Sequence, residues 1–217
     1  MKTRRQFATA ALRFLAGAGL VVNPVMAFLH SAFAAVQRRV LPKGTDLQSL
    51  THEHPSAVDA RNLDIMPIEA FNTMGLSDHP VSLDLWRLEV AGRVKTPLRL
   101  TYNELLALPA VEGNVLLICP GIFTINAHWK GVAVSELLKT AGAEEEGVSY
   151  VTVHGPQGNY EKVENFTPAE VAAGKVFLAY AVNGQALPQK HGFPLRVVAE
   201  DRFGSDWVKY VYKIEAR

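Results

Sequence analysis

The chain has 217 residues, of which 48% are hydrophobic and 20% are charged, and its formal net charge is +1. These values are typical of one ordinary globular domain with a sizeable core, and they exclude a disordered or collagen-like chain. A nucleic-acid partner is also disfavoured, because proteins that bind phosphate backbones carry a strongly basic surface.

The N-terminus has the features of an export signal. The Arg4-Arg5 pair, with Phe7 two positions later, precedes an uncharged run over residues 14–29, and residues 32–34 have the small-residue pattern of a cleavage site. The run is shorter than the ~20 residues that a spanning helix needs. We therefore predict that residues 1–34 form a twin-arginine signal peptide and that the twin-arginine machinery exports the protein to the periplasm; an uncleaved membrane anchor is the alternative. Cleavage of residues 1–34 would remove four Lys or Arg residues and no acidic residue, so the mature chain would have a net charge of +1 minus 4, or −3.

Residues 35–80 are predicted to form an extended segment that wraps the domain at residues 81–217. The segment is rich in proline and glycine and shows little apolar periodicity. His52 and His54 lie within it and resemble a pair of metal ligands, but histidines in a polar linker are more commonly exposed to solvent than bound to a metal.

Two strands and a helix are predicted next. Residues 85–90 alternate apolar and polar side chains, and the short apolar stretch at residues 98–100 follows after a turn, which predicts an antiparallel pair at a sheet edge. Thr101 and Glu104 have the spacing of a capping box, and Pro109 ends the helix that they begin.

The only cysteine of the chain follows an apolar run. Residues 115–118 predict a buried strand that ends at Cys119, because Pro120-Gly121 breaks it. A single cysteine cannot form an internal disulfide, a c-type haem attachment or an iron–sulfur cluster. Cys119 is therefore either a buried small hydrophobe or a functional thiol at a strand end, and a free thiol outside the cell is a liability unless it is buried or bonded.

The second half of the chain is predicted to form short strands and short helices. Asn183-Gly184 is its strongest turn signal. About seven strands, three short helices and no repeated βαβ spacing predict an α+β fold with mixed, mostly antiparallel sheets. The predicted strands are residues 128–132, 148–153, 176–182, 195–199 and 207–214, and the predicted helices are residues 135–140 and the turn that Thr167 begins.

A second informative stretch covers residues 187–196 and continues to Lys209. His191 and Arg196 stand on either side of a Gly-Phe-Pro turn, and Lys209 follows thirteen residues later. A guanidinium binds phosphate with two parallel hydrogen bonds, and the Gly204-Ser205 loop can add backbone N–H groups, so these residues predict an anion cradle. A structural turn with solvated charges is the alternative.

These motifs, in this order, resemble the molybdopterin domain of the sulfite oxidase family, above all its short exported single-domain members such as methionine-sulfoxide reductase subunits. The resemblance covers about residues 60–217, and the His-Gly-Phe-Pro-x-Arg element at this distance from a strand-end cysteine is its most specific part. It rests on Trp86-Arg-Leu-x-Val-x-Gly92, the cysteine strand, Trp129-x-Gly131-Val132, Leu178-Ala-Tyr180, Asn183-Gly184, Leu187-Pro188, His191-Gly-Phe-Pro-Leu-Arg196 and Val208-Lys209. The resemblance implies a sulfite oxidase-type molybdopterin-binding fold.

The resemblance also implies a cofactor and its ligands. Cys119 corresponds to the thiolate ligand of a molybdenum whose other sulfurs come from one molybdopterin, and soft thiolates suit such a metal. A cofactor is consistent with twin-arginine export, which carries folded proteins. The cofactor-binding residues implied by the resemblance are Phe71, Asn72, Thr73, Cys119, His154, His191, Arg196, Trp207, Val208 and Lys209.

The implied activity is that of a molybdenum-dependent oxidoreductase. Members of the family move an oxygen atom to or from a small-molecule substrate, either in sulfoxide reduction or in sulfite-type oxidation. This chain has no haem motif, so its electrons are expected to pass to a separate protein such as a cytochrome or a membrane haem subunit. Ile122 and Phe123 stand where sulfite oxidases often have polar residues after the cysteine, which favours a neutral or sulfoxide-like substrate.

Two other interpretations remain open at this point. The first is a cysteine hydrolase or transferase that uses Cys119 with His191 or His128 as its base. The second is an exported binding domain without redox activity. No general acid or base is identified, since Tyr102, Tyr160 and Asp201 are each interpreted as structural.

Overall fold

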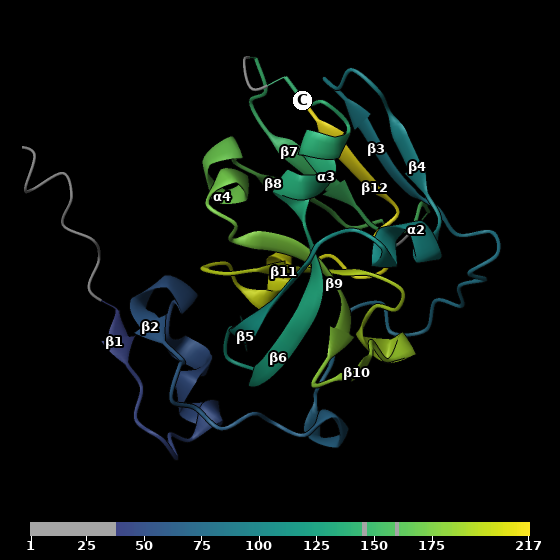
Figure 1. Ribbon diagram of the computed structural model, residues 1–217. Helices are drawn as coiled ribbons and strands as arrows, with labels where there is room; N and C mark the ends of the chain where they lie inside the picture. The colour runs from purple at the N-terminus through teal and green to yellow at the C-terminus, as the bar shows by residue number, and fades with distance from the viewer. Residues whose placement is uncertain (1–37, 145–146, 159–160) are drawn as a thin grey trace, which may run out of the picture. The chain divides into compact units, whose positions relative to one another are not determined.

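The computed structural model of the protein describes residues 38–144, 147–158 and 161–217 (Figure 1). The predicted signal peptide at residues 1–34 and Tyr160 lie outside the described residues. Within the described ranges, no helix has both the length and the apolar character needed to cross a membrane.

Short strands and single-turn helices make up the described chain. In chain order, the elements are β1 (Arg39–Val40), η1 (Leu47–His52), η2 (Pro55–Ala57), β2 (Val58–Asp59), η3 (Ile68–Ala70), β3 (Leu88–Gly92), β4 (Leu98–Leu100), α2 (Tyr102–Leu106), β5 (Ala110–Cys119), β6 (Phe123–Ala133), α3 (Val134–Thr140), β7 (Val151–His154), β8 (Val163–Phe166), α4 (Pro168–Ala172), β9 (Val176–Val182), β10 (Gln185–Ala186), η4 (Gln189–His191), β11 (Arg196–Ala199), η5 (Gly204–Asp206) and β12 (Lys213–Ala216), where η marks a 3-10 helix.

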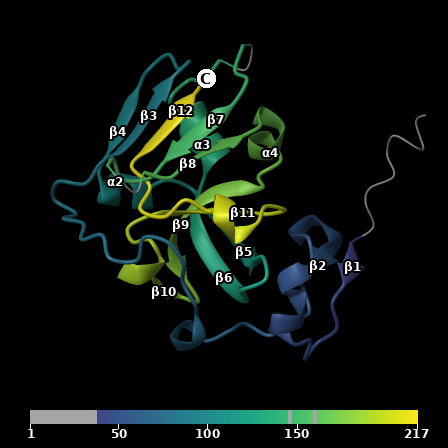
Figure 2. The same cartoon turned by 180° about the vertical axis from the view of Figure 1, so that it is seen from behind.

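Two five-stranded sheets carry the fold. The first has the order β10-β9-β6-β5, with β11 also paired to β9, and all its pairs are antiparallel. The second has the order β4-β3-β12-β7-β8, in which only the β12–β3 pair is parallel. Figures 1 and 2 show the second sheet at the top of both views, with β5, β6 and β10 below it. The prediction of an α+β fold with mixed, mostly antiparallel sheets and short helices is confirmed.

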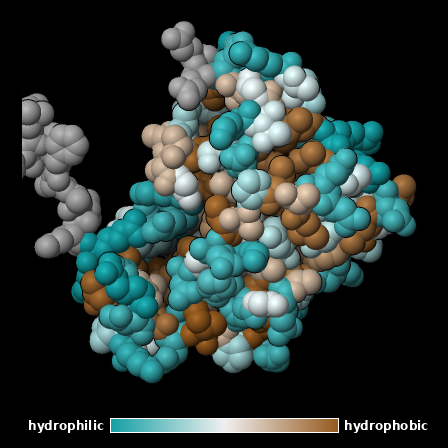
Figure 3. Space-filling view, viewed as in Figure 1, coloured by the Kyte–Doolittle hydropathy of each residue, from teal (hydrophilic) through white to brown (hydrophobic). Residues whose placement is uncertain are grey.

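One hydrophobic cluster joins the two sheets. It contains Trp129 and Leu178 of the first sheet together with Val90 and Ile214 of the second, and all four side chains are buried. Burial of apolar side chains of this size contributes about 1.5–3 kcal/mol each, so the two sheets stabilise one another. On the face drawn in Figure 3, the hydrophobic residues that reach the surface lie in several separate groups among hydrophilic ones.

The C-terminal half of β5 has both of its faces buried. Leu117 and Cys119 belong to the cluster between the sheets, while Leu116 and Ile118 belong to a second cluster. Successive side chains of a strand point to opposite faces, which is why this stretch is a continuous apolar run. The second cluster is completed by Leu41, Leu50, Val58 and Leu63. The segment at residues 38–64 therefore covers one face of β5 and leaves Cys119 on the other.

Several local signals act as predicted. Thr101 and Glu104 form a capping box at α2, and Thr167 and Glu170 form another at α4. The Asn183-Gly184 turn joins β9 to β10, and both residues have the positive φ, 49° and 76°, that a tight hairpin turn requires.

The predicted strand at residues 207–214 is wrong over most of its length. β12 begins only at Lys213, and the residues before it form a loop that is paired with β11 through a single bridge between Lys209 and Arg196. Tyr210 has a φ of 55°, in the left-handed region that a strand does not tolerate. Strands β1, β2, β8 and β10 were not predicted. β6 begins five residues earlier than predicted, and β3 begins three residues later.

Candidate active site and cofactor cavity

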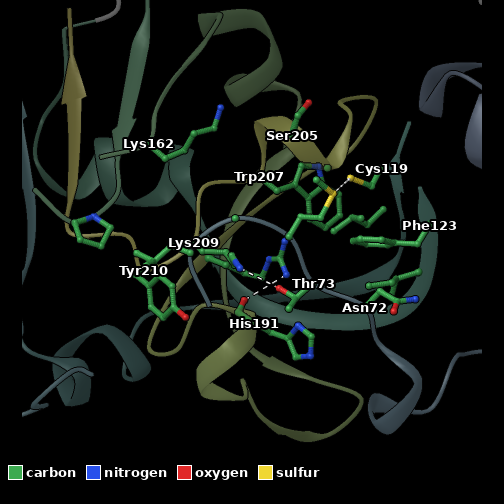
Figure 4. A pocket seen from close by; sticks show the side chains of 18 of the residues that line it. Asn72, Thr73, Cys119, Phe123, Lys162, His191, Ser205, Trp207, Lys209 and Tyr210 are labelled. Atoms are coloured by element: carbon green, nitrogen blue, oxygen red, sulfur yellow. Dashed lines mark hydrogen bonds between the residues drawn. The ribbon is translucent and has the colours of Figure 1, made fainter. Parts of the chain in front are cut away.

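A cavity of about 370 Å³ opens next to the end of β5. Figure 4 shows its side chains, which come from the segment after η3, the β5–β6 hairpin, the loop after β7 and the region between η4 and β12. The lining residues are Asn72, Thr73, Met74, Gly75, Leu76, Leu117, Cys119, Phe123, Ile125, Pro156, Glu161, Lys162, His191, Arg196, Gly204, Ser205, Trp207, Lys209 and Tyr210.

Cys119 is held at the end of a long hairpin. It is the last residue of β5 and pairs with Phe123 across the turn, where the backbone N–H of Ile122 donates to the carbonyl of Cys119 at 3.0 Å. Gly121 has a φ of 70°, a conformation that glycine adopts without steric cost, and its N–H donates to the carbonyl of Thr51 at 2.9 Å. The hairpin and the N-terminal segment together fix the position of the Cys119 side chain.

The thiol of Cys119 faces an apolar neighbour. Its Sγ lies 3.4 Å from Sδ of Met74, and only 9% of the residue is exposed. Burial raises the pKa of the thiol, and no cationic side chain in the described part of the chain offsets that effect. A thiol with a raised pKa is protonated at neutral pH unless a metal displaces its proton.

This environment does not suit a cysteine nucleophile. Such a nucleophile needs an imidazole within hydrogen-bond reach, and among the described residues the hydrogen-bond partner of Sγ is Met74. Nδ1 of His128 instead lies 2.8 Å from Oδ1 of Asn114, and His191 has no hydrogen bond to Cys119. The hydrolase interpretation therefore lacks its base.

Arg196 brings a buried positive charge to the cavity. Only 5% of the residue is exposed, and its guanidinium lies over the rings of Trp129 and Trp207, at 5.0 and 5.5 Å from their centroids. Burial lowers the pKa of Arg196 to about 10, so the group stays charged at neutral pH. Its Nη1 donates to the carbonyl of His191 at 3.3 Å.

His191 and Lys209 lie next to Arg196 and respond to the same burial. Burial, together with the neighbouring charge of Arg196, lowers the pKa of His191 to about 4 and that of Lys209 to about 8. The imidazole is therefore neutral at pH 7. Nζ of Lys209 donates to Oγ1 of Thr73 at 3.0 Å and to the carbonyl of Lys190 at 3.3 Å.

A glycine allows these groups to come together. Gly192 ends η4 with a φ of 109°, and a Cβ at this position would lie 3.0 Å from Cβ of Lys209 and 3.2 Å from Cβ of Arg196. A side chain here would have a strained backbone and would shift Lys209 or Arg196 by a few tenths of an ångström. The positive φ and these close contacts together favour glycine in the His-Gly-Phe-Pro motif.

Three buried polar atoms on the cavity wall have no hydrogen-bond partner within the described part of the chain: Nε2 of His191, Nε of Arg196 and the hydroxyl of Tyr210. An unpaired buried polar group costs about 1–3 kcal/mol, which a bound ligand with acceptor atoms would offset. The cavity has a thiol at one end and cationic donors on its wall. This combination suits a ligand that carries both a metal with a preference for thiolate ligands and an anionic group. Molybdopterin with its molybdenum has both, so the residues present fit it.

The structure brings most of the sequence-predicted residues together. Three of the ten lie outside the cavity wall. Phe71 is buried behind it and packs edge-on against His191 with ring centroids 5.5 Å apart, and Val208 lies in the core. His154 lines a neighbouring cavity of about 420 Å³, which shares Pro156 and Glu161 with the first. The other seven, Asn72, Thr73, Cys119, His191, Arg196, Trp207 and Lys209, line the cavity.

Met74 and Tyr210 line the cavity but were not predicted. Each directly follows a predicted residue in the sequence, Thr73 and Lys209 respectively, and that adjacency was the only signal available. The suggested metal pair receives no support, since the described residues contain no group of three or more metal-binding side chains. Nδ1 of His54 instead lies 2.7 Å from Oγ of Ser56.

The fold and the cavity thus define a protein in which one cavity combines a buried cysteine with cationic donors, a combination that suits an anionic cofactor with a metal. Residues 76–217 match the family model described as the oxidoreductase molybdopterin binding domain. This match covers more than half of the chain, so the chain belongs to that family. The prediction of a molybdenum-dependent oxidoreductase that carries molybdopterin is confirmed at the level of the family.

Similar proteins agree with this assignment. The chain is 29% identical over 157 residues to a nitrate reductase [NADH] of Volvox carteri, which covers 59% of this chain and 18% of that protein. It is 33% identical over 132 residues to the uncharacterized oxidoreductase YuiH of Bacillus subtilis, and the match covers 59% of this chain and 65% of YuiH. It is 28% identical over 156 residues to the protein-methionine-sulfoxide reductase catalytic subunit MsrP of Gluconobacter oxydans. This match covers 65% of this chain and 49% of that subunit.

A solved structure supports the fold. The sulfane dehydrogenase SoxCD of Paracoccus pantotrophus matches with a TM-score of 0.58 and 28% sequence identity, over 63% of this chain and 39% of that chain. The predicted sulfite oxidase-type fold is therefore confirmed. In each of these four comparisons the chain spans less than two thirds of the similar protein's length.

Proposed function

We propose that this chain is an exported catalytic domain that exchanges an oxygen atom with a small-molecule substrate and exchanges electrons with a separate protein. The observation that carries the proposal is the cavity that joins the sulfur of Cys119 to the unpartnered donors of His191 and Arg196. When bound, molybdopterin supplies a redox-active metal at which oxygen-atom exchange takes place.

The protein's own residues have separate tasks in this proposal. With molybdopterin bound, Cys119 would hold the metal as a thiolate, and Arg196 and Lys209 would neutralise the phosphate of the cofactor. His191 stays neutral and offers one ring nitrogen to the pterin or its phosphate, which is supported by its lowered pKa of about 4. Trp207 and Trp129 exclude water from the guanidinium of Arg196, which strengthens its interaction with an anion.

The metal-ligand role of Cys119 is tested by Cys119→Ser. We expect this variant to lose the molybdenum–thiolate features of the Mo(V) electron-paramagnetic spectrum and all metal-centred activity, because the only thiolate of the chain is removed. The matched control is Ile118→Val on the same strand, whose side chain faces the other cluster and whose shortening costs about 1 kcal/mol. Metal-centred redox activity that survives in Cys119→Ser would overturn the ligand assignment.

Sulfoxide reduction and sulfite-type oxidation are the two reactions to compare. The first consumes two electrons and two protons and releases a thioether and water, whereas the second consumes water and releases sulfate, two electrons and two protons. The names of relatives that act on methionine sulfoxide and on sulfane sulfur support a sulfur-containing substrate. Fast turnover of sulfite with ferricyanide, and none of methionine sulfoxide with a reduced viologen, would exclude the reductase direction.

Export and domain division complete the proposal. Residues 1–34 act as a twin-arginine signal, residues 35–80 wrap the domain at residues 81–217, and the electron partner is a cytochrome or a membrane haem subunit. The Arg4-Arg5 pair supports the export part. Replacing both arginines by lysine should trap the protein in the cytoplasm, and fractionation of cells that express each form measures this. Equal periplasmic amounts of the two forms would refute twin-arginine export.

A further inference from the structure

The cavity has two ends of different chemistry. Figure 4 shows Lys209, Tyr210 and His191 close together and Cys119 on the opposite side, near Phe123. At the sulfur end, two apolar side chains lie beside Cys119: Met74 contacts its sulfur, and Phe123 is its partner across the hairpin. The polar residues on this side, Ser205 and Asn72, carry no charge.

Met74 links the sulfur end to solvent. Its Sδ lies 3.4 Å from Sγ of Cys119, yet 50% of the residue is exposed. Among the described residues that line the cavity, Met74 is the only large hydrophobic side chain that is exposed. It therefore lies between the cysteine sulfur and the surrounding water.

Neighbouring contacts hold Met74 in place. Oγ1 of Thr73 accepts a hydrogen bond from Nζ of Lys209 and donates one to the carbonyl of Lys190 at 3.2 Å. Phe71 is buried against His191 and Trp129. Since Thr73 and Phe71 are held by these contacts, the chain that leads to Met74 is fixed before any ligand enters.

We propose that Met74 determines which substrates reach the metal, and that it selects uncharged molecules with an apolar group beside the reacting atom. This inference rests on the proposed function and names its substrate class. An oxyanion that passes an apolar entrance loses hydration and finds no cationic partner there, because Lys209 lies at the other end of the cavity, where the proposed function assigns it to the cofactor phosphate. An apolar molecule buries surface against Met74 and Phe123 instead, and a thioether side chain adapts to varied shapes.

Thiol labelling tests the entrance without relying on activity. Cys119 is the only cysteine, so the full chain purified without cofactor gives a signal from one sulfur. The probes are a neutral methanethiosulfonate and its anionic sulfonatoethyl counterpart, each compared with its rate on free cysteine. We expect the wild-type protein to favour the neutral probe, and Met74→Lys to raise the relative rate of the anionic probe about tenfold, since local positive charge concentrates anions.

Three other variants separate charge from shape. Met74→Glu should lower the relative rate of the anionic probe, which keeps the test decisive if the lysine variant does not fold. Met74→Leu preserves an apolar side chain of similar size and should leave the ratio within about twofold of the wild type. Leu85→Lys adds the same charge at a residue that is 81% exposed and outside the cavity wall, so it should leave the ratio unchanged. The inference would be overturned if the ratio of anionic to neutral labelling rates did not change with the charge at position 74. It would also be overturned if a charge at position 85 changed this ratio by the same amount.

The loaded protein distinguishes this inference from the proposed function. If molybdenum is bound and Met74→Lys raises the ratio of kcat/KM for sulfite to kcat/KM for a neutral sulfoxide about tenfold, the inference and the proposed function are both supported. If molybdenum is bound and neither that shift nor the labelling ratio responds, the inference fails and the function stands. If purified protein from a cofactor-producing host holds no molybdenum, the proposed function fails, and with it the assignment of a substrate to this entrance.

Discussion

The two ends of the cavity are built in different ways. Cys119 ends a ten-residue strand in which every residue is paired with β6. At the other end, His191 and Lys209 come from a single-turn helix and a loop, and only Arg196 belongs to a strand. A metal–sulfur bond depends on the position of one atom, so a rigid hairpin suits it. A phosphate and a pterin offer many acceptors, so donors from separate loops can share them.

Trp129 connects the two ends, and its loss should have the largest effect. Its Nε1 donates to the carbonyl of Val115 in β5 at 3.1 Å, and its ring lies under the guanidinium of Arg196. We expect Trp129→Ala to lower the free energy of unfolding by about 3–5 kcal/mol and to reduce the molybdenum content. Urea unfolding and metal analysis measure the two effects. Trp129→Phe keeps a ring, so an equal loss in both variants would contradict a stabilising role for ring packing.

His191 should make the stability of the cofactor-free protein depend on pH. The unfolded chain binds a proton near pH 6.5, whereas the folded chain does so only near pH 4. Stability is therefore lost as pH falls through this window. Between pH 6.5 and 4.5 we expect a loss of about 2–3 kcal/mol, since each unit of pKa shift corresponds to about 1.4 kcal/mol.

Urea unfolding at a series of pH values measures the effect of His191. The window above pH 4.5 avoids Glu170, whose pKa the Arg202 guanidinium lowers to about 2. His191→Asn should flatten the profile in this window. An unchanged slope in that variant would show that other groups cause the loss.

Arg196→Met tests the cationic end alone, with the smallest effect on the fold. A hydrogen bond to a charged group contributes about 1.5–3 kcal/mol, so we expect cofactor affinity to fall about 10- to 100-fold. The cofactor-free variant should be at least as stable as the wild type, because a buried charge without a carboxylate partner is removed. Arg202→Met is the matched control, since Arg202 pairs with Glu170 outside the cavity wall. Full pterin retention by Arg196→Met would contradict a cofactor-binding role.

Local signals predicted the elements that carry Cys119, and tertiary contacts decided the rest. The apolar run before Pro120 and the capping box at Thr101 depend on neighbours in sequence, so both were predictable. The loop at residues 207–212 was predicted as a strand because its apolar residues suit one, whereas the positive φ of Tyr210 arises only in the folded chain.

The wall of the cavity was only partly predictable for the same reason. Met74 reaches Cys119 from a residue 45 positions earlier in the chain, a contact that no local pattern records. His154 was predicted to bind the cofactor because the resemblance places it near a family contact, but its side chain faces the neighbouring cavity with Glu161 and Glu215. Its role as a cofactor ligand stays a prediction.

The double burial of β5 affects where a working fragment can begin. The family match starts at residue 76, but Leu116 and Ile118 are covered by residues 41–63, and the turn after Cys119 is bonded to Thr51. A fragment trimmed to the matched region would leave one side of β5 bare and would lack Thr73 and Met74. The unit that must be produced intact to load a cofactor therefore extends well upstream of the stretch that identifies the family.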